Sequence, residues 1–219
     1  MDNIIHSNES AITPSVGLVT WYAEGTEGGP FHSRKCSVPS NSSGLTIGRG
    51  YDMKERRPDG ILQDLMDAQV TLASGTILSN AAGLYGDDAR AFIVENELHD
   101  FEISKVGQKK LFVKTYLQLK ADVQRICKKA DVVAKYGKCN WPTLNPAIVD
   151  ILVDLRFRGD FTGAARGRLQ KFVVANDLAG FAHVMLDPAY WAQVPKDRFD
   201  RRASFLKLAV RALPTKKAP

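Results

Sequence analysis

The segment from Pro146 to Phe157 most strongly limits how this chain can fold, because apolar residues occupy nearly every side of the helix it would form. A helix that is apolar all round must be covered by other elements. We therefore expect it to be the central, surrounded helix of a mainly helical domain. Its polar exceptions, Asp150, Asp154 and Arg158, stand four residues apart and share one face. This face is expected to be either solvated or directed into a cleft, and we interpret Asp154 and Arg158 as a pair with a structural role in this helix.

Further helical patterns occupy most of the chain after Pro58. From Ser104 to Ala130, apolar residues recur at alternating steps of four and three, which predicts an amphipathic helix. Weaker patterns predict helices over 60–83, 87–98, 165–187 and 198–213. A short buried helix is expected to start at Ser15 as its N-cap and to stop at Gly25.

The region 25–58 is rich in Gly, Pro and Ser and lacks helical periodicity, which is typical of turns and short strands. The predicted class is α+β, mainly α, with a small N-terminal β-lobe and a larger helical lobe around the central helix. We expect a polar tail over 1–14 and one domain over 15–213. Within that domain the β-rich lobe covers 25–58 and the helical lobe 59–213.

The net charge of +6 and a pI near 9.2 favour a polyanionic partner, such as nucleic acid, an anionic membrane or an anionic cell wall. The basic residues are scattered in pairs and never form a block, which argues against dedicated nucleic-acid binding. No apolar run is long enough for a transmembrane span, so we expect no stable membrane insertion. The four scattered histidines predict no metal site, and no cofactor is expected.

The three cysteines, Cys36, Cys127 and Cys139, form neither a disulfide framework nor a zinc motif. Cys127 and Cys139 can pair if the chain turns back near Tyr136. The alternative, which we favour, is three reduced cysteines in a protein made in the cytoplasm. The first twenty residues lack the basic and apolar regions of a signal peptide.

The stretch from Glu24 to Met53 contains the residue types that glycoside hydrolysis needs. Glu24 follows the short apolar helix, where the negative end of the helix dipole favours a protonated carboxyl group. Thr46 and Asp52 bracket a turn with two glycines. A carboxylic acid, a second carboxylate and a water-holding hydroxyl are the minimum set for this chemistry. Glu27, in the glycine-rich loop, is the competing acid.

These residues resemble the pesticin-like branch of the phage-type lysozymes, which are muramidases that cut peptidoglycan strands. The similarity spans about residues 15–210. It is carried by five segments that occur in the order seen in that branch: Glu24-Gly25, Ser43–Met53, Ile103–Phe112, Asn145–Asp160 and Val194–Arg202.

One spacing departs from ordinary phage lysozymes, which place the catalytic Asp nine residues after the Glu. That position is Ser33 when counted from Glu24, and Cys36 when counted from Glu27. In this chain, as in the pesticin-like branch, the Asp follows the Thr. We therefore assign Asp52 and keep Cys36 as a minor alternative.

The resemblance implies a lysozyme-like fold and a hydrolase for the β-1,4 bond between N-acetylmuramic acid and N-acetylglucosamine. Glu24 would protonate the glycosidic oxygen, Asp52 would activate or support the attacking water, and Thr46 would position it, with inversion at the anomeric carbon. We also consider His32, Arg49 and Tyr51 as substrate contacts. The alternatives are an exposed loop histidine for His32 and a surface turn for the other two.

Two other functions remain open. A lytic transglycosylase would cut the same bond with a single Glu, and a non-catalytic module would bind the wall without cutting it. In each case the partner is the peptidoglycan strand. We expect a monomer that acts in the periplasm or cell wall and is delivered as a phage endolysin through a holin, as a bacteriocin domain or as a type VI secretion effector. An effector of this kind would have a periplasmic immunity protein.

Overall fold

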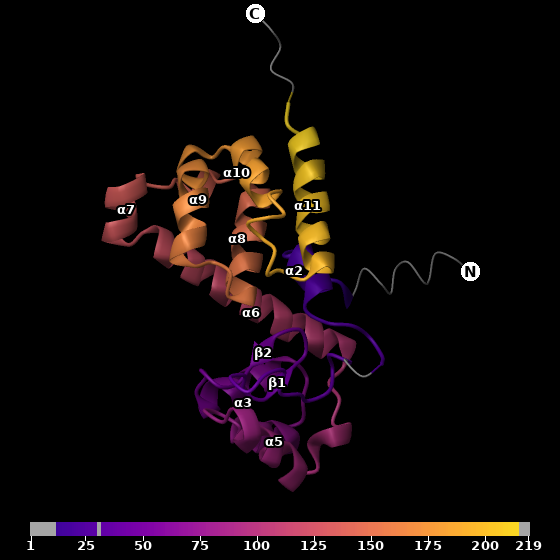
Figure 1. Ribbon diagram of the computed structural model, residues 1–219. Coiled ribbons are helices and arrows are strands. Elements are labelled where there is room, and N and C mark those ends of the chain that lie inside the picture. The colour runs from indigo at the N-terminus through magenta and orange to yellow at the C-terminus, as the bar shows by residue number, and fades with distance from the viewer. Residues whose placement is uncertain (1–11, 30–31, 215–219) are drawn as a thin grey trace, which may run out of the picture. The chain divides into compact units, whose positions relative to one another are not determined.

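In the computed structural model, which describes residues 12–29 and 32–214, the chain is mainly helical and has one small two-stranded sheet (Figure 1). The predicted α+β, mainly α class is confirmed at this level. Two compact units make up the chain, residues 1–116 and residues 117–219. Most of the predicted polar tail, residues 1–11, lies outside the described residues.

The first unit contains the short strands and the smaller helices. In the described part of region 25–58 the chain forms two short paired strands and several isolated bridges. The predicted helix over 60–83 is interrupted at Gln69, whose φ of 67° lies in the left-handed region. Its elements are α2 (Leu18–Ala23), β1 (Thr46–Ile47), β2 (Tyr51–Asp52), α3 (Pro58–Asp67), α4 (Leu72–Ser79), α5 (Gly86–Glu95), the 3₁₀ helix η1 (Leu98–Asp100) and the first part of α6 (Lys105–Cys127).

Helix α2 begins two residues later than predicted. Its N-cap is Gly17, with φ 65°, and not Ser15. A Cβ atom at position 17 would lie 2.5 Å from the ring of Tyr116, so this position requires both the left-handed backbone and the missing side chain of glycine. The start of α2 therefore depends on the packing of Gly17 against Tyr116, which is distant in sequence, and not on a local N-cap at Ser15.

The hairpin β1–β2 inserts one of its two faces into the core of the first unit. The strands pair antiparallel with Ile47 opposite Tyr51 and Thr46 opposite Asp52. Because side chains alternate between faces along a strand, the two pairs point in opposite directions. Ile47 and Tyr51 are fully buried in a cluster that includes Ile61 of α3. The Thr46–Asp52 face is thus directed away from that core.

The second unit is built around α8, as the apolar pattern predicts. Eight of the 13 residues of α8 are buried, and Figure 1 shows this helix among α9, α10 and α11. Asn145 caps its start by accepting a hydrogen bond from the backbone N–H of Ala147 at 2.9 Å, and Gly159 ends it with φ 91°. The unit contains the rest of α6, then α7 (Ala130–Tyr136), η2 (Trp141–Thr143), α8 (Pro146–Arg158), α9 (Gly163–Ala175), α10 (Leu178–Met185) and α11 (Lys196–Arg211).

Asp154 and Arg158 make structural contacts, as expected, but they do not pair with each other, and Asp154 is neither solvated nor directed into a cleft. Asp154 is fully buried, and its carboxylate accepts hydrogen bonds from Arg198 Nη2 at 2.7 Å and Arg202 Nε at 2.5 Å. Arg158 instead pairs with Asp160. Because both partners of Asp154 belong to α11, the cluster is a polar connection between the central helix and the last helix.

All three cysteines have free thiols. Burial raises the pKa of Cys127, and it raises the pKa of Cys139 to about 11. Both thiols are therefore protonated at neutral pH, and the pairing of Cys127 with Cys139 is absent from this structure. Within the described ranges, no helix combines the length and the apolar character needed to cross a membrane.

Candidate functional site

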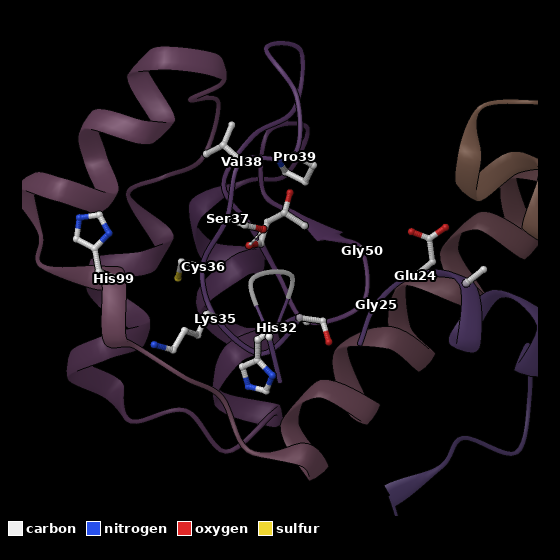
Figure 2. Close-up of a pocket in the computed structure, with 15 residues that line it drawn as sticks. Glu24, Gly25, His32, Lys35, Cys36, Ser37, Val38, Pro39, Gly50 and His99 are labelled. Atoms are coloured by element: carbon white, nitrogen blue, oxygen red, sulfur yellow. Dashed lines mark hydrogen bonds between the residues drawn. The ribbon is translucent and has the colours of Figure 1, made fainter. Parts of the chain in front are cut away.

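A pocket of about 700 Å³ in the first unit contains two of the three residues assigned to catalysis, Glu24 and Thr46. This volume is in the range of sites that bind small organic ligands. Figure 2 shows Glu24 at one side of the pocket and His99 at the other. The lining consists of Ala23, Glu24, Gly25, Gly29, His32, Ser33, Lys35, Cys36, Ser37, Val38, Pro39, Thr46, Gly48, Gly50 and His99.

Glu24 occupies the C-cap of α2, as the end signals predict, and its backbone N–H donates to the carbonyl of Thr20 at 3.0 Å. Its side chain is partly buried at the pocket wall. The next residue must be small, because a Cβ on Gly25 would lie 2.6 Å from the Cβ of Ser33. Gly25 therefore lets Ser33 pack directly against the backbone that follows Glu24.

Arg49 holds the backbone on both sides of Glu24. Its guanidinium donates from Nη1 to the carbonyl of Trp21 and, at 2.6 Å, to that of Gly25, and it stacks 4.2 Å from the centre of the Trp21 ring. The side chain is only 6% exposed, and burial lowers its pKa. The contacts observed for Arg49 are thus with α2 and its following loop. They also place a positive charge at the negative end of the helix dipole.

Thr46 and Asp52 face each other across the hairpin, but only Thr46 belongs to the pocket lining. The Thr46 hydroxyl donates to the carbonyl of Gly44 at 3.1 Å. The Asp52 carboxylate accepts from the backbone N–H groups of Gly44 at 3.1 Å and Lys54 at 2.8 Å. A Cβ on Gly44 would lie 2.5 Å from Asp52 Oδ1, so this glycine permits the close approach. Among the described lining residues, Glu24 is the only carboxylate.

Glu27, the competing acid, is held by two neighbours. Its carboxylate accepts from Arg34 Nε at 2.9 Å and from Gln108 Nε2 at 2.8 Å. Burial raises the pKa of Glu27, but the hydrogen bonds from Arg34 and Gln108 and the charge of Arg34 outweigh burial and lower it overall. A carboxyl group that is kept ionised is poorly suited to donate a proton at neutral pH. These contacts argue against Glu27 as a general acid.

His32 and Cys36 both line the pocket, with different chemical character. The Nδ1 atom of His32 accepts from the backbone N–H of Gly28 at 2.6 Å, and its Nε2 atom lies 3.2 Å from a carboxylate oxygen of Glu102. Burial raises the pKa of Cys36 to about 12. Because the thiol stays protonated, Cys36 is a poor substitute for a catalytic carboxylate.

Tyr51 lies in the core and not in the lining. Its side chain is 0% exposed, its hydroxyl donates to Asp64 Oδ2 at 2.8 Å, and the Arg56 guanidinium stacks 4.0 Å from the ring centre. The strand alternation that leaves Thr46 and Asp52 on one face turns Tyr51 to the other. These contacts give Tyr51 a packing position, and it cannot reach a ligand in the pocket.

Sequence reasoning did not identify Lys35 and His99 as pocket residues. The backbone of Lys35 forms an isolated antiparallel β-bridge with Glu102, and its Nζ atom lies 2.9 Å from Oδ1 of Asp100. These two contacts bring η1, and with it His99, to this wall of the pocket. His32 and Lys35 belong to one segment, and His99 lies more than sixty residues further along the chain. No local pattern around His99 signals the contact, so only the folded chain reveals it.

Comparison with known proteins identifies one family. Residues 17–203 match the model of a family described as "Domain of unknown function (DUF8812)". The chain belongs to this family. No curated protein matches it.

The part of the chain that matches DUF8812 includes every lining residue of the pocket. It also includes α8 and the three charged residues of the buried Asp154 cluster, Asp154, Arg198 and Arg202. Among the described residues, no group of three or more His, Cys, Asp and Glu side chains is arranged to hold a metal ion. The part of this chain that matches the family model thus contains both the Glu24 pocket and the buried charge cluster.

Proposed function

We propose that this DUF8812 protein is a muramidase with a lysozyme-like fold that hydrolyses the β-1,4 bond between N-acetylmuramic acid and N-acetylglucosamine in peptidoglycan. The observation that carries the proposal is Glu24, a single carboxyl group at a helix end in the wall of a pocket of about 700 Å³, together with the Thr46 hydroxyl. The resemblance of segments 24–25 and 43–53 to the pesticin-like lysozymes supports the choice of substrate.

In this mechanism Glu24 donates its proton to the glycosidic oxygen as the bond to the anomeric carbon breaks. Thr46 holds the attacking water: its proton is given to the Gly44 carbonyl, so its oxygen lone pairs are available as acceptors. Asp52 accepts two backbone N–H bonds and still has lone pairs that can take the water's proton. Arg49 maintains the backbone position of Glu24 throughout.

Product analysis tests the reaction directly. Purified sacculi incubated with the protein are expected to release soluble muropeptides whose reducing ends are hydrated, because water attacks the anomeric carbon. Mass spectrometry distinguishes these from 1,6-anhydro ends, which are lighter by one water. A digest with only anhydro ends would replace the hydrolase with a lytic transglycosylase. Sacculi that bind the protein but release nothing would indicate a non-catalytic wall-binding module.

The lytic transglycosylase is the second candidate because of one observation: the Asp52 carboxylate is bonded to the backbone of its own hairpin and does not line the pocket. A transglycosylase needs Glu24 but not Asp52, since the substrate's own 6-hydroxyl replaces water. The pocket with its single carboxylate suits either reaction, and the role of Asp52 separates them.

Replacing Asp52 with Asn is expected to reduce muropeptide release about a hundredfold or more, because the amide cannot take a proton from water. The change keeps the side-chain size but costs about 1–3 kcal/mol, because the amide nitrogen cannot accept and one of the two backbone N–H groups loses its acceptor. Release rate and thermal unfolding are measured on the same preparations. A folded Asp52→Asn protein with the parent rate would contradict the assigned role and favour the transglycosylase.

This function also sets where the protein would act. Peptidoglycan lies outside the cytoplasmic membrane, so we propose action in the periplasm or cell wall, with delivery by a holin or a secretion system. For a secreted effector, a periplasmic immunity protein that fills the Glu24 pocket is part of the proposal.

A further inference from the structure

The two units differ sharply in charge. Residues 1–116 carry 11 Lys and Arg against 15 Asp and Glu, a net charge of −4, whereas residues 117–219 carry 19 against 9, a net charge of +10. The sum is the +6 of the whole chain. The positive charge therefore belongs to the second unit, while the Glu24 pocket belongs to a unit that by itself repels a polyanion.

Part of this surplus is concentrated in residues 128–138, which we call the basic segment. It contains Lys128, Lys129, Lys135 and Lys138, all exposed, and a single acidic residue, Asp131. Among the described residues, no carboxylate lies within salt-bridge distance of these four ammonium groups.

The basic segment adjoins a shallow groove of about 490 Å³, which Lys128 and Lys129 line together with Ala121, Gln124 and Arg125. Arg125 differs from the lysines because it forms an ion pair with Asp122, a carboxylate that it shares with Arg156. The free charge beside the groove is therefore that of the lysines. Exposed ammonium groups without ion-pair partners can exchange water for anionic groups of a ligand without breaking an internal salt bridge.

The surroundings of the lysines favour a flexible anionic polymer over a lipid surface or nucleic acid. Between residues 118 and 140, all of them described, no large hydrophobic side chain is exposed, and Leu117, one helical turn before Ala121, is the nearest along the chain before this range. A single leucine is a small apolar anchor compared with the apolar face that an interfacial membrane helix buries. The one tyrosine there, Tyr136, is partly buried, and no exposed aromatic ring is available for stacking on bases. What the segment offers is charge alone.

We propose that the basic segment binds the peptide-stem carboxylates of peptidoglycan and so holds the enzyme on its polymer. The choice of polymer rests on the proposed function. In this proposal the basic segment binds carboxylates of the peptide stems, whereas the Glu24 pocket binds the glycan strand at the bond that is cut. Each lysine near an anionic surface contributes on the order of fivefold in affinity at low salt. The combined effect offsets the repulsion by the first unit.

The test measures binding in the Glu24→Gln background, in which no cleavage is expected to remove the substrate. The full-length protein is sedimented with purified sacculi over a range of salt concentrations. Changing Lys128, Lys129 and Lys138 together to Gln is expected to weaken binding at low salt about tenfold or more and to flatten its salt dependence. The matched control changes Arg57, Lys207 and Arg211 to Gln, which are exposed residues outside the segment, and is expected to bind within about twofold of the parent.

A second arm leaves the protein unchanged and alters the polymer. Sacculi whose carboxylates have been amidated are expected to bind the Glu24→Gln protein as weakly as intact sacculi bind the triple variant. Equal binding by the triple variant and its control, or undiminished binding to amidated sacculi, would overturn the proposal. So would tighter binding to phosphatidylglycerol vesicles or duplex DNA than to sacculi. Because sedimentation requires no cleavage, failure of the muramidase proposal would appear only in the product analysis.

Discussion

Replacing Glu24 with Gln is expected to lower the rate of muropeptide release from sacculi by about 10³-fold while the thermal unfolding midpoint stays unchanged. The amide has the shape of the carboxyl group but cannot donate a proton to the departing glycosidic oxygen, and general acid catalysis contributes about 10²–10⁴-fold. Release of soluble muropeptides from purified sacculi and circular dichroism on the same samples provide the two measurements.

The matched control is Glu27→Gln, which changes the other acid of the same loop. Glu27 pairs with Arg34 and Gln108, and these contacts keep its carboxyl group ionised, so its loss should reduce loop stability but leave most of the activity. An active Glu24→Gln protein together with an inactive, folded Glu27→Gln protein would move the proton donor to Glu27. Full activity in both variants would remove the muramidase proposal.

The second large effect is expected at Asp154, which is 0% exposed between Arg198 and Arg202. Changing it to Asn removes the buried negative charge that Arg198 and Arg202 share, although Arg202 keeps its ion pair with Asp160. Breaking a buried ion pair from one side costs about 3–5 kcal/mol. For a chain of this length, that corresponds to a lowering of the melting temperature by roughly 10 °C. The exposed Asp197, at the start of the same helix, is the control: Asp197→Asn should change the melting temperature by only a degree or two.

The same cluster predicts how stability depends on pH. Burial raises the pKa of Asp154, but the charges of Arg202 and Arg198 and their hydrogen bonds outweigh burial and hold the pKa below its ordinary value. A carboxyl group with a lowered folded-state pKa stabilises the protein above its unfolded pKa of about 3.9 and loses that contribution as the pH falls through the folded value. The stability difference between the parent and Asp154→Asn should therefore be full at pH 6 and shrink below about pH 4. A constant difference across this range would contradict the ion-pair explanation.

Several features of the fold could be predicted because their signals are local. The apolar pattern of 146–157 requires a surrounded helix, and α8 is that helix. Asn145 and Gly159 mark its ends by short-range capping chemistry. Glu24 could be located at the end of α2 because an apolar run followed by glycine is readable in a few residues. In each case the energetic cause lies within a few positions of the residue concerned.

The partners of side chains were much harder to predict. Asp154 was expected to pair with Arg158 on its own helix, yet its partners lie 44 and 48 residues further along the chain. Tyr51 and Asp52 are adjacent in sequence, but strand alternation buries the first and leaves the second on the opposite face. His99 lies in the pocket wall because its neighbour Asp100 forms an ion pair with Lys35. No sequence spacing predicts a contact between two residues so far apart in the chain.

The amino-acid sequence by itself therefore determined the helical class, the position of the central helix and the residues able to carry acid–base chemistry, because hydrophobic period, capping and side-chain type act over short distances. Only the tertiary structure decided that Glu24 and Thr46 share a pocket, that Arg49 is bonded to α2, and that the positive charge of the chain belongs to one unit. Those outcomes depend on which distant segments pack together. Burial and ion pairing act through space, so the same residue types in the same order are compatible with many such arrangements until the chain has folded.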